Sequence, residues 1–285
     1  MATYHEGELE VQRRAGVAAN AERIGRGIHQ EIPELARRFA AERRFLLLGA
    51  ADAAGRVWAT LLQGPAGFLS VPAENHLHVA AWPRPGDPLA ETLAGPADVG
   101  TLLIEPATRR RMRLNGRTRP DGAGGLDIAT REVYANCPKY IHPRDVALPP
   151  LAATARVARG DRLSPEQIAW LSRTDTLFLA TRHPVAGADV SHRGGEPGFV
   201  RVADANRLLM PDYAGNMMFN SLGNVAADGR AGLLLVNFTS GRTLQLTGTA
   251  TILWDPALVA TFEHAERVVE LEIEAVVDIE PDSSA

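Results

Sequence analysis

The chain has 285 residues, of which 45% are hydrophobic and 22% are charged, a composition typical of a folded globular protein with a sizeable core. Thirty basic residues against 34 acidic ones give a formal net charge of −4, which argues against a general nucleic-acid-binding protein. No apolar run reaches the ~20 residues that cross a bilayer, and the single cysteine, Cys137, excludes an internal disulfide framework. We therefore expect a soluble cytoplasmic protein with no membrane and no nucleic-acid partner.

The first predicted elements are helices, and the later ones are mostly strands. Residues Gly16–Arg43 carry apolar side chains at helical spacing, with Pro33 as a break between two helices. Ser164 and Pro165 begin a further helix, and Asp255 begins a short one. The strand candidates that follow Ser164 are Thr176–Thr181, Asp189–Arg193, Gly198–Ala203, Arg207–Pro211, Ala231–Phe238, Thr243–Ile252 and Val269–Glu274. Such short, closely spaced strands favour an antiparallel barrel over a parallel sheet.

The strands form two copies of one unit. Arg44–Ala50 resembles Asp175–Thr181 at an offset of 131 positions, and Gly64–Val71 resembles Gly195–Val202 at the same offset. Gly100–Ile104 then resembles Gly232–Val236 at an offset of 132, so that one insertion separates the blocks. The sequence therefore predicts a tandem duplication, with too few copies for a solenoid.

The second copy is richer in polar groups than the first. Asn216, Asn220 and Asn224 are spaced four apart, which predicts one face of a helix that starts at Asn216. A helix start with amide and hydroxyl side chains suits a phosphate, although an ordinary N-cap followed by surface amides would give the same pattern. The second copy also has the polar, glycine-rich Asp189–Gly195 where the first has the apolar Trp58–Gly64. Together these differences predict a phosphate-bearing ligand in the second copy.

In these residues the chain resembles the pyridoxamine 5′-phosphate oxidase-related flavoproteins, the split-barrel group that binds FMN. The resemblance rests on Phe178–Thr181, Asp189–Val202, Pro211–Asn224, Gly232–Phe238 and Leu244–Gly248, while Asn136–Ile141 and the first copy resemble the longer, two-copy members. It implies a mainly β protein with flanking helices, built as two tandem FMN-binding split β-barrels that form a pseudo-dimer. The implied segments are an N-terminal helical segment at 1–43, a degenerate barrel copy at 44–146, a linker at 147–160 and the FMN-binding copy at 161–285.

The resemblance also implies which residues bind FMN. Val190, Ser191 and His192 would line the ring, and Pro211 and Asp212 would flank the ribityl chain. The phosphate would be held by Asn216, Asn220, Ser221 and Asn224. Arg242 or Thr243 would approach from the opposite strand. His192 and Arg193 are the candidate catalytic residues, since His192 could relay a proton and Arg193 could stabilise an anionic reduced flavin. No metal site is predicted.

One position departs from the family pattern. Met217 and Met218 stand where the oxidases have an Arg-Lys pair, so neutral donors replace two cations unless Arg193 or an arginine of the partner barrel compensates. The arginines of Thr108–Arg113 are interpreted as a solvated turn between strands.

The expected function is that of an FMN-dependent oxidoreductase of this group, acting on a small-molecule substrate or a nicotinamide donor, with a homodimer as a further option. Two alternatives stay open. One is a non-catalytic flavin-binding or sensor module, and the other is a split barrel that binds haem or deazaflavin.

Overall fold

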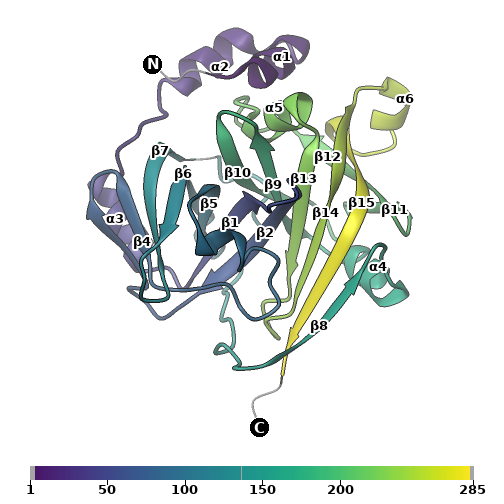
Figure 1. The fold of residues 1–285 in the computed structure, drawn as a ribbon. Helices are drawn as coiled ribbons and strands as arrows, with labels where there is room; N and C mark the ends of the chain where they lie inside the picture. The colour runs from purple at the N-terminus through teal and green to yellow at the C-terminus, as the bar shows by residue number, and fades with distance from the viewer. Residues whose placement is uncertain (1–3, 136, 283–285) are drawn as a thin grey trace.

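The computed structural model describes residues 4–135 and 137–282 and is mainly β, with two antiparallel sheets and a few short helices (Figure 1). The strands of the first sheet are β1 (Phe45–Ala51), β2 (Val57–Gln63), β3 (Leu69–Ala73), β4 (His76–Val79), β5 (Ala97–Glu105), β6 (Arg110–Pro120) and β7 (Leu126–Ala135). Those of the second are β8 (Ala155–Gly160), β9 (Thr176–His183), β10 (Gly187–Gly194), β11 (Arg201–Asp204), β12 (Arg207–Tyr213), β13 (Arg230–Val236), β14 (Thr243–Leu253) and β15 (Ala265–Pro281). The helices are α1 (Glu6–Arg14), α2 (Ala18–Gly25), α3 (Glu34–Ala41), α4 (Pro165–Leu171), α5 (Asn220–Ala227) and α6 (Pro256–Val259), with one 3₁₀ turn, η1 (Thr92–Ala94). In the described part of the chain, every helix is too short or too polar to cross a membrane.

The two sheets repeat one topology. The strand order β2-β1-β5-β6-β7-β4-β3 of the first sheet matches β10-β9-β13-β14-β15-β12-β11 of the second, strand for strand. The register matches as well, since Phe45 pairs with Gln63 and Thr176 pairs with Gly194, 131 positions later. A β-bulge precedes Gly116 in β6 and the equivalent Gly248 in β14. The mainly β fold with two similar halves, predicted from the sequence, is confirmed.

Helix boundaries follow local capping signals. The Ser164 side chain accepts a hydrogen bond from the backbone N–H of Gln167 at the start of α4, and Asp255 caps α6 in the same way. Pro33 precedes the first residue of α3, as its helix-breaking character predicts. These starts lie where the sequence analysis expects them.

Three elements differ from the sequence expectations. Helix α1 occupies a segment for which no element was expected, and β8 occupies the last six residues of the expected linker, where it pairs with the end of β15. The helix expected from Asn216 begins only at Asn220, because Phe219 has a left-handed backbone (φ 60°) that a continuous right-handed helix excludes. Asn216 therefore lies in the loop before α5 and does not share a helix face with Asn220 and Asn224.

Each sheet covers an apolar core, and Val277 and Ile279 of β15 add to the core of the first sheet. A third buried cluster joins the two copies. The joining cluster includes Leu47 and Val57 of the first copy and Phe178 and Val190 of the second. Packing between the copies thus buries side chains from both sheets and makes one compact unit (Figure 1).

Glycines allow the two copies to approach closely at equivalent points. A Cβ atom on Gly100 would lie 2.4 Å from the Cα of Asp189, and one on Gly232 would lie 2.4 Å from the carbonyl oxygen of Val57. Gly100 and Gly232 are equivalent in the repeat, so the two contacts are related by an approximate twofold axis. The backbones meet at these glycines because no side chain separates them.

Candidate functional site

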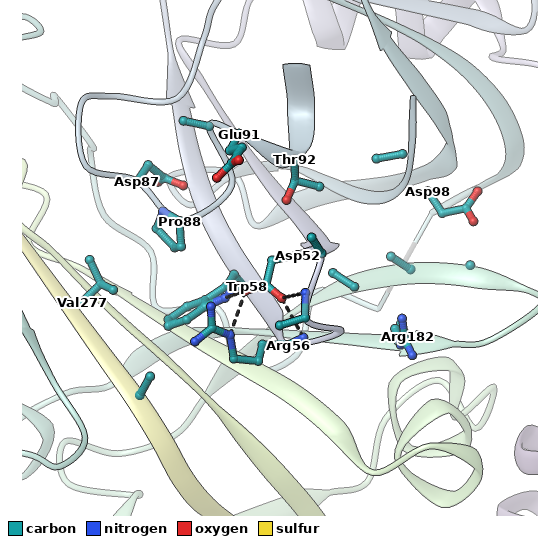
Figure 2. A pocket seen from close by; sticks show the side chains of 18 of the residues that line it. Asp52, Arg56, Trp58, Asp87, Pro88, Glu91, Thr92, Asp98, Arg182 and Val277 are labelled. Carbon is teal, nitrogen blue, oxygen red and sulfur yellow. Dashed lines mark hydrogen bonds and ion pairs between the residues drawn. The ribbon is translucent and has the colours of Figure 1, made fainter. Parts of the chain in front are cut away.

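A cavity of about 980 Å³ lies between the β1–β2 turn, the β9–β10 turn, residues 87–98 and β15 (Figure 2). Its charged side chains are largely paired within the protein. Asp52 accepts hydrogen bonds from Arg56 Nε at 2.8 Å and from Trp58 Nε1 at 3.1 Å (Figure 2). Arg182 pairs with Asp228, which is not part of the cavity lining. Trp58 itself is only 2% exposed, so its ring is not available to a ligand.

The repeat explains why this cavity exists. Its lining residues Trp58 and Ala275 are equivalent to Asp189 and Glu132, both of which lie near Glu8 of α1 on the other side of the molecule. The large cavity is therefore the counterpart of the space that α1 fills. Most of the charged side chains in its lining are paired within the protein and do not point to a particular ligand.

A second cavity of about 100 Å³ lies between the two copies at the start of α5. It is lined by β10, β12 and residues 215–222 of the second copy, and by β6 and the segment after β7 from the first. The residues of the sequence prediction that line it are Ser191, His192, Arg193, Pro211, Asp212, Asn216, Asn220 and Ser221. The predicted residues that are not part of its lining are Val190, Asn224, Arg242 and Thr243. We take this smaller cavity as the candidate site, because it collects buried polar atoms without partners.

Two arginines of the first copy reach into this cavity. The sequence interpretation allowed for an arginine of the partner barrel, but it did not name Arg111 or Arg113. Arg111 and Arg113 alternate along β6, so their side chains leave the same face of the strand and line the cavity. Arg109 on the preceding turn and Arg110 at the first position of β6 are exposed. The interpretation of the whole Thr108–Arg113 segment as a solvated turn is thus wrong for its last two arginines. The spacing of Arg111 and Arg113 two apart on a strand is the signal that could have identified them.

The same geometry explains the placement of Arg242 and Thr243. Thr243 in β14 is the repeat equivalent of Arg111 in β6, and it is β6 of the first copy that borders this cavity. Arg242 instead pairs with Asp278 at 2.8 Å and with Glu166. A strand does approach from the opposite side, as expected, but it comes from the other copy.

Three guanidinium groups converge on the cavity with unused donors. Arg113 Nη1 donates to Asp189 Oδ1 at 3.1 Å, Arg111 Nη1 donates to His192 Nδ1 at 3.3 Å, and Arg193 pairs with Asp212. The Nε atoms of Arg111, Arg113 and Arg193 are all buried without a hydrogen-bond partner. Buried donors are normally satisfied, so these guanidinium groups are the donors that an acceptor in the cavity would use.

Ionisation in the cavity reflects burial and this excess of cations. Burial, together with the nearby Arg113 and Arg193, lowers the pKa of Arg111 to about 9. Burial and the charges of Arg111 and Arg193 lower the pKa of His192 well below its usual value, so the ring is neutral at pH 7. Because Arg111 donates to Nδ1 of His192, the ring hydrogen is on Nε2. An anion in the cavity would relieve the repulsion among the arginines.

The hydroxyl and amide groups expected to hold a phosphate have partners within the protein. Ser221 Oγ donates to Asp189 Oδ2 at 2.6 Å and lies 2.9 Å from Ser191 Oγ. Asn224 Nδ2 donates to Thr181 Oγ1 at 3.0 Å, and Asn220 Nδ2 donates to Glu8 Oε1 at 2.6 Å. In this structure their donor groups are directed at protein oxygens.

The outer wall of the cavity has an unusual backbone. Met217 (φ 63°), Phe219 (φ 60°) and Tyr140 (φ 63°) all adopt the left-handed conformation, which is uncommon for residues with large side chains. Tyr140 stacks on Tyr213 with ring centroids 5.0 Å apart, and Tyr140 and Met217 are the more exposed members of the wall. Three of the five described non-glycine residues with positive φ therefore lie on this wall.

The equivalent place on the other side of the twofold axis is closed by a carboxylate. Thr60 and Gln245, the repeat equivalents of Ser191 and Arg113, both donate to Asp87, Gln245 Nε2 at 3.1 Å. The backbone N–H of Leu89 donates to Asp87 as well, at 2.9 Å, and burial raises the pKa of this carboxyl group. This side therefore lacks the cations of the smaller cavity.

Comparison with known proteins gives one matching family and several solved structures of similar fold. Residues 163–283 match the model of the pyridoxamine 5′-phosphate oxidase family. A protein from Lactobacillus delbrueckii assigned to these oxidases is 22% identical, with 40% of this chain and 93% of that chain covered and a TM-score of 0.34. HupZ from Group A Streptococcus, in a variant form, is 13% identical over 40% of this chain and 98% of its own, with a TM-score of 0.34. An F420 reductase is 15% identical over 38% and 90%, with a TM-score of 0.28. With TM-scores below 0.5 these likenesses do not bear on activity, and no curated protein matches the chain.

Proposed function

We propose that this chain, whose residues 163–283 belong to the pyridoxamine 5′-phosphate oxidase-like split-barrel family, binds FMN between its two copies and acts as an oxidoreductase on a small substrate. The observation that carries the proposal is the set of three buried guanidinium groups with unpartnered Nε atoms around one cavity. Planar guanidinium groups bind phosphate oxygens well, because their N–H donors match the geometry of the anion.

In this proposal the phosphate is held by Arg111, Arg113 and Arg193. They supply the positive charge that Met217 and Met218 cannot, and two of the three come from the first copy. The residues of the sequence prediction keep other roles. Ser191 and His192 border the ring and Asp212 orients Arg193, while Asn220, Ser221 and Asn224 shape the site through their contacts with Glu8, Asp189 and Thr181.

The cavity fits the phosphate end of FMN and requires movement for the rest. Small-molecule pockets typically measure ~300–1,000 Å³, more than the about 100 Å³ found between the copies. The wall that must move is the one formed by Tyr140 and Met217, whose side chains are 39% and 36% exposed. Their exposure means that outward displacement breaks few buried contacts.

A bound flavin supplies the redox chemistry, and the protein positions it and excludes water. His192, neutral with its hydrogen on Nε2, offers a hydrogen bond to a ligand acceptor and carries no charge at pH 7. Arg111 holds the ring of His192 in this tautomer by donating to Nδ1. The arginines that bind the phosphate thereby also fix the direction of the hydrogen bond that His192 can make.

Replacing Arg111 by glutamine is expected to lower FMN affinity by about 10- to 100-fold, because a hydrogen bond to a charged group contributes ~1.5–3 kcal/mol. Riboflavin, which lacks the phosphate, is expected to lose much less. Flavin fluorescence quenching in a titration with each compound measures both values.

Arg110→Gln is the matched control, since Arg110 is the neighbouring residue on β6 but is 54% exposed and pairs with Glu105. It should leave both affinities unchanged. Equal losses of FMN and riboflavin affinity in Arg111→Gln would place the phosphate elsewhere, and a protein that binds neither compound would refute the proposal. Turnover of NADH or NADPH with added acceptors then separates an oxidoreductase from a flavin-binding module without catalysis.

A further inference from the structure

Helix α1 packs directly on the start of α5, at the edge of the proposed ligand site (Figure 1). The two backbones meet at glycines, and a Cβ atom on Gly7 would lie 2.2 Å from the carbonyl oxygen of Gly223. Gln12 Nε2 also donates to the carbonyl oxygen of Met218 at 2.9 Å, in the loop that lines the cavity. Helix α1 therefore contacts the backbone before Asn220, at Met218, and after it, at Gly223.

This packing places one carboxylate of α1 against the amide of Asn220. Glu8, which is 5% exposed, accepts a hydrogen bond at Oε2 from the backbone N–H of His5 (2.9 Å) and at Oε1 from Asn220 Nδ2 (2.6 Å). The other end of that amide, Asn220 Oδ1, is buried and has no hydrogen-bond partner. Asn220 lines the cavity, and Oδ1 is the amide atom that the protein leaves without a partner.

An amide oxygen and an amide N–H select opposite ligand groups. The oxygen receives a donor, such as a ribityl hydroxyl, and repels a phosphate oxygen, whereas the N–H does the reverse. We propose that Glu8 is a positioning residue of the ligand site, whose protonation state sets which end of the Asn220 amide faces the bound molecule. This inference rests on the proposed ligand site, and it adds the N-terminal helix to that site.

The orientation of the Asn220 amide depends on which hydrogen bonds the Glu8 carboxyl group can make. Ionised Glu8 accepts at both oxygens and holds Nδ2 of Asn220. Protonated Glu8 keeps accepting from the backbone N–H of His5 at Oε2 and therefore carries its hydrogen on Oε1. That O–H no longer accepts from Nδ2 of Asn220, and it donates to Oδ1 when the amide turns over, which directs Nδ2 to the cavity.

The surroundings of Glu8 place this change near neutral pH. The groups that face it are His5 and Tyr4 beside α1, Glu132 on β7, Asp189 on β10 and Asn220 on α5. Burial, together with the charges of Glu132 and Asp189, raises the pKa of Glu8 to about 8. The pKa values of His5 and His192 are lowered and that of Tyr4 is raised to about 12, so these groups do not titrate between pH 6.5 and 9.

Sulfate is a suitable probe, because its own charge does not change in this range. Wild-type protein is expected to bind sulfate about tenfold more weakly at pH 9 than at pH 6.5, since an N–H donor is exchanged for an oxygen. Glu8→Gln should keep the tighter binding at pH 9, because its amide accepts from His5 and donates to Asn220 Oδ1 at every pH. Glu6→Gln, on the same helix but 79% exposed and outside the cavity, is the matched control and should behave as wild type. Any titration of Arg111 affects all three proteins alike and cancels in the comparison.

A second readout does not depend on a ligand. The side-chain amide resonances of Asn220, assigned by their loss in Asn220→Asp, should shift with pH in the wild-type protein and stay constant in Glu8→Gln. Equal pH dependence of sulfate binding in wild type and Glu8→Gln, or an Asn220 amide that ignores pH, would overturn the inference. Absence of sulfate binding at every pH, with the amide shift still present, would instead refute the proposed anion site and leave the Glu8–Asn220 switch standing.

Discussion

Replacing Arg113 by methionine is expected to destabilise the protein by about 3–5 kcal/mol, the usual cost of removing one partner of a buried ion pair. Arg113 and Asp189 are 8% and 2% exposed, and they join β6 of the first copy to β10 of the second. Burial lowers the pKa of Arg113, but the adjacent Asp189 carboxylate outweighs this effect and raises the pKa above its ordinary value. Without the guanidinium, Asp189 would keep only neutral donors, from Asn115, Tyr134 and Ser221.

Urea unfolding followed by tryptophan fluorescence measures this loss. Arg110→Met is the control, since Arg110 is exposed and lies three residues before Arg113 on β6. It should change the free energy of unfolding by less than about 0.5 kcal/mol. The double variant Arg113→Met, Asp189→Asn should recover part of the stability, because it removes the uncompensated charge. A single Arg113→Met variant as stable as wild type would show that the pair does not hold the copies together.

Alanine at Gly232 is expected to destabilise the protein by about 3 kcal/mol or more, at the upper end of the cost of overpacking a core. The added methyl would lie 2.4 Å from the carbonyl oxygen of Val57 in the other copy, a backbone atom that cannot rotate away. Accommodating it requires the two sheets to separate, which would also loosen the buried cluster that they share.

Gly95→Ala is the control for this substitution. A Cβ atom at Gly95 meets no other atom within 4 Å, and the residue has an ordinary negative φ of −127°. Its effect on the free energy of unfolding should be near zero or slightly stabilising, because alanine restricts the unfolded chain. Similar stabilities for Gly232→Ala and wild type would contradict the close approach of the sheets at this point.

Much of the fold could be predicted from the sequence, because its signals are local. Turn residues delimit the strands, Ser164 and Gln167 specify the start of α4, and the fixed offset between the copies predicts matching topologies. The start of α5 could not be predicted this way. The asparagine spacing favours a helix from Asn216, but the left-handed backbone of Phe219 delays the helix by four residues, and no residue type at this position signals that conformation.

The candidate site was less predictable, because it is built from three distant parts of the chain. The sequence resemblance identified the strand with Ser191 and His192, both of which line the cavity. It did not identify Arg111 and Arg113, which act across the copy boundary, nor Glu8, whose helix precedes the first copy. Contacts between segments more than 70 residues apart leave no periodic pattern in a single sequence, and only the alternation of the two arginines hinted at a buried face.

Asp87 closes the place that is equivalent to the smaller cavity on the other side of the twofold axis. This closure bears on why the two copies share one chain. Two identical subunits related by symmetry must carry identical sites, so a mutation that improves one site alters both. When the two copies are fused in one chain, a mutation in one copy leaves the other copy unchanged. In the proposed function the first copy contributes Arg111 and Arg113 to the ligand site of the second, so that each chain has one asymmetric site whose two walls can evolve separately.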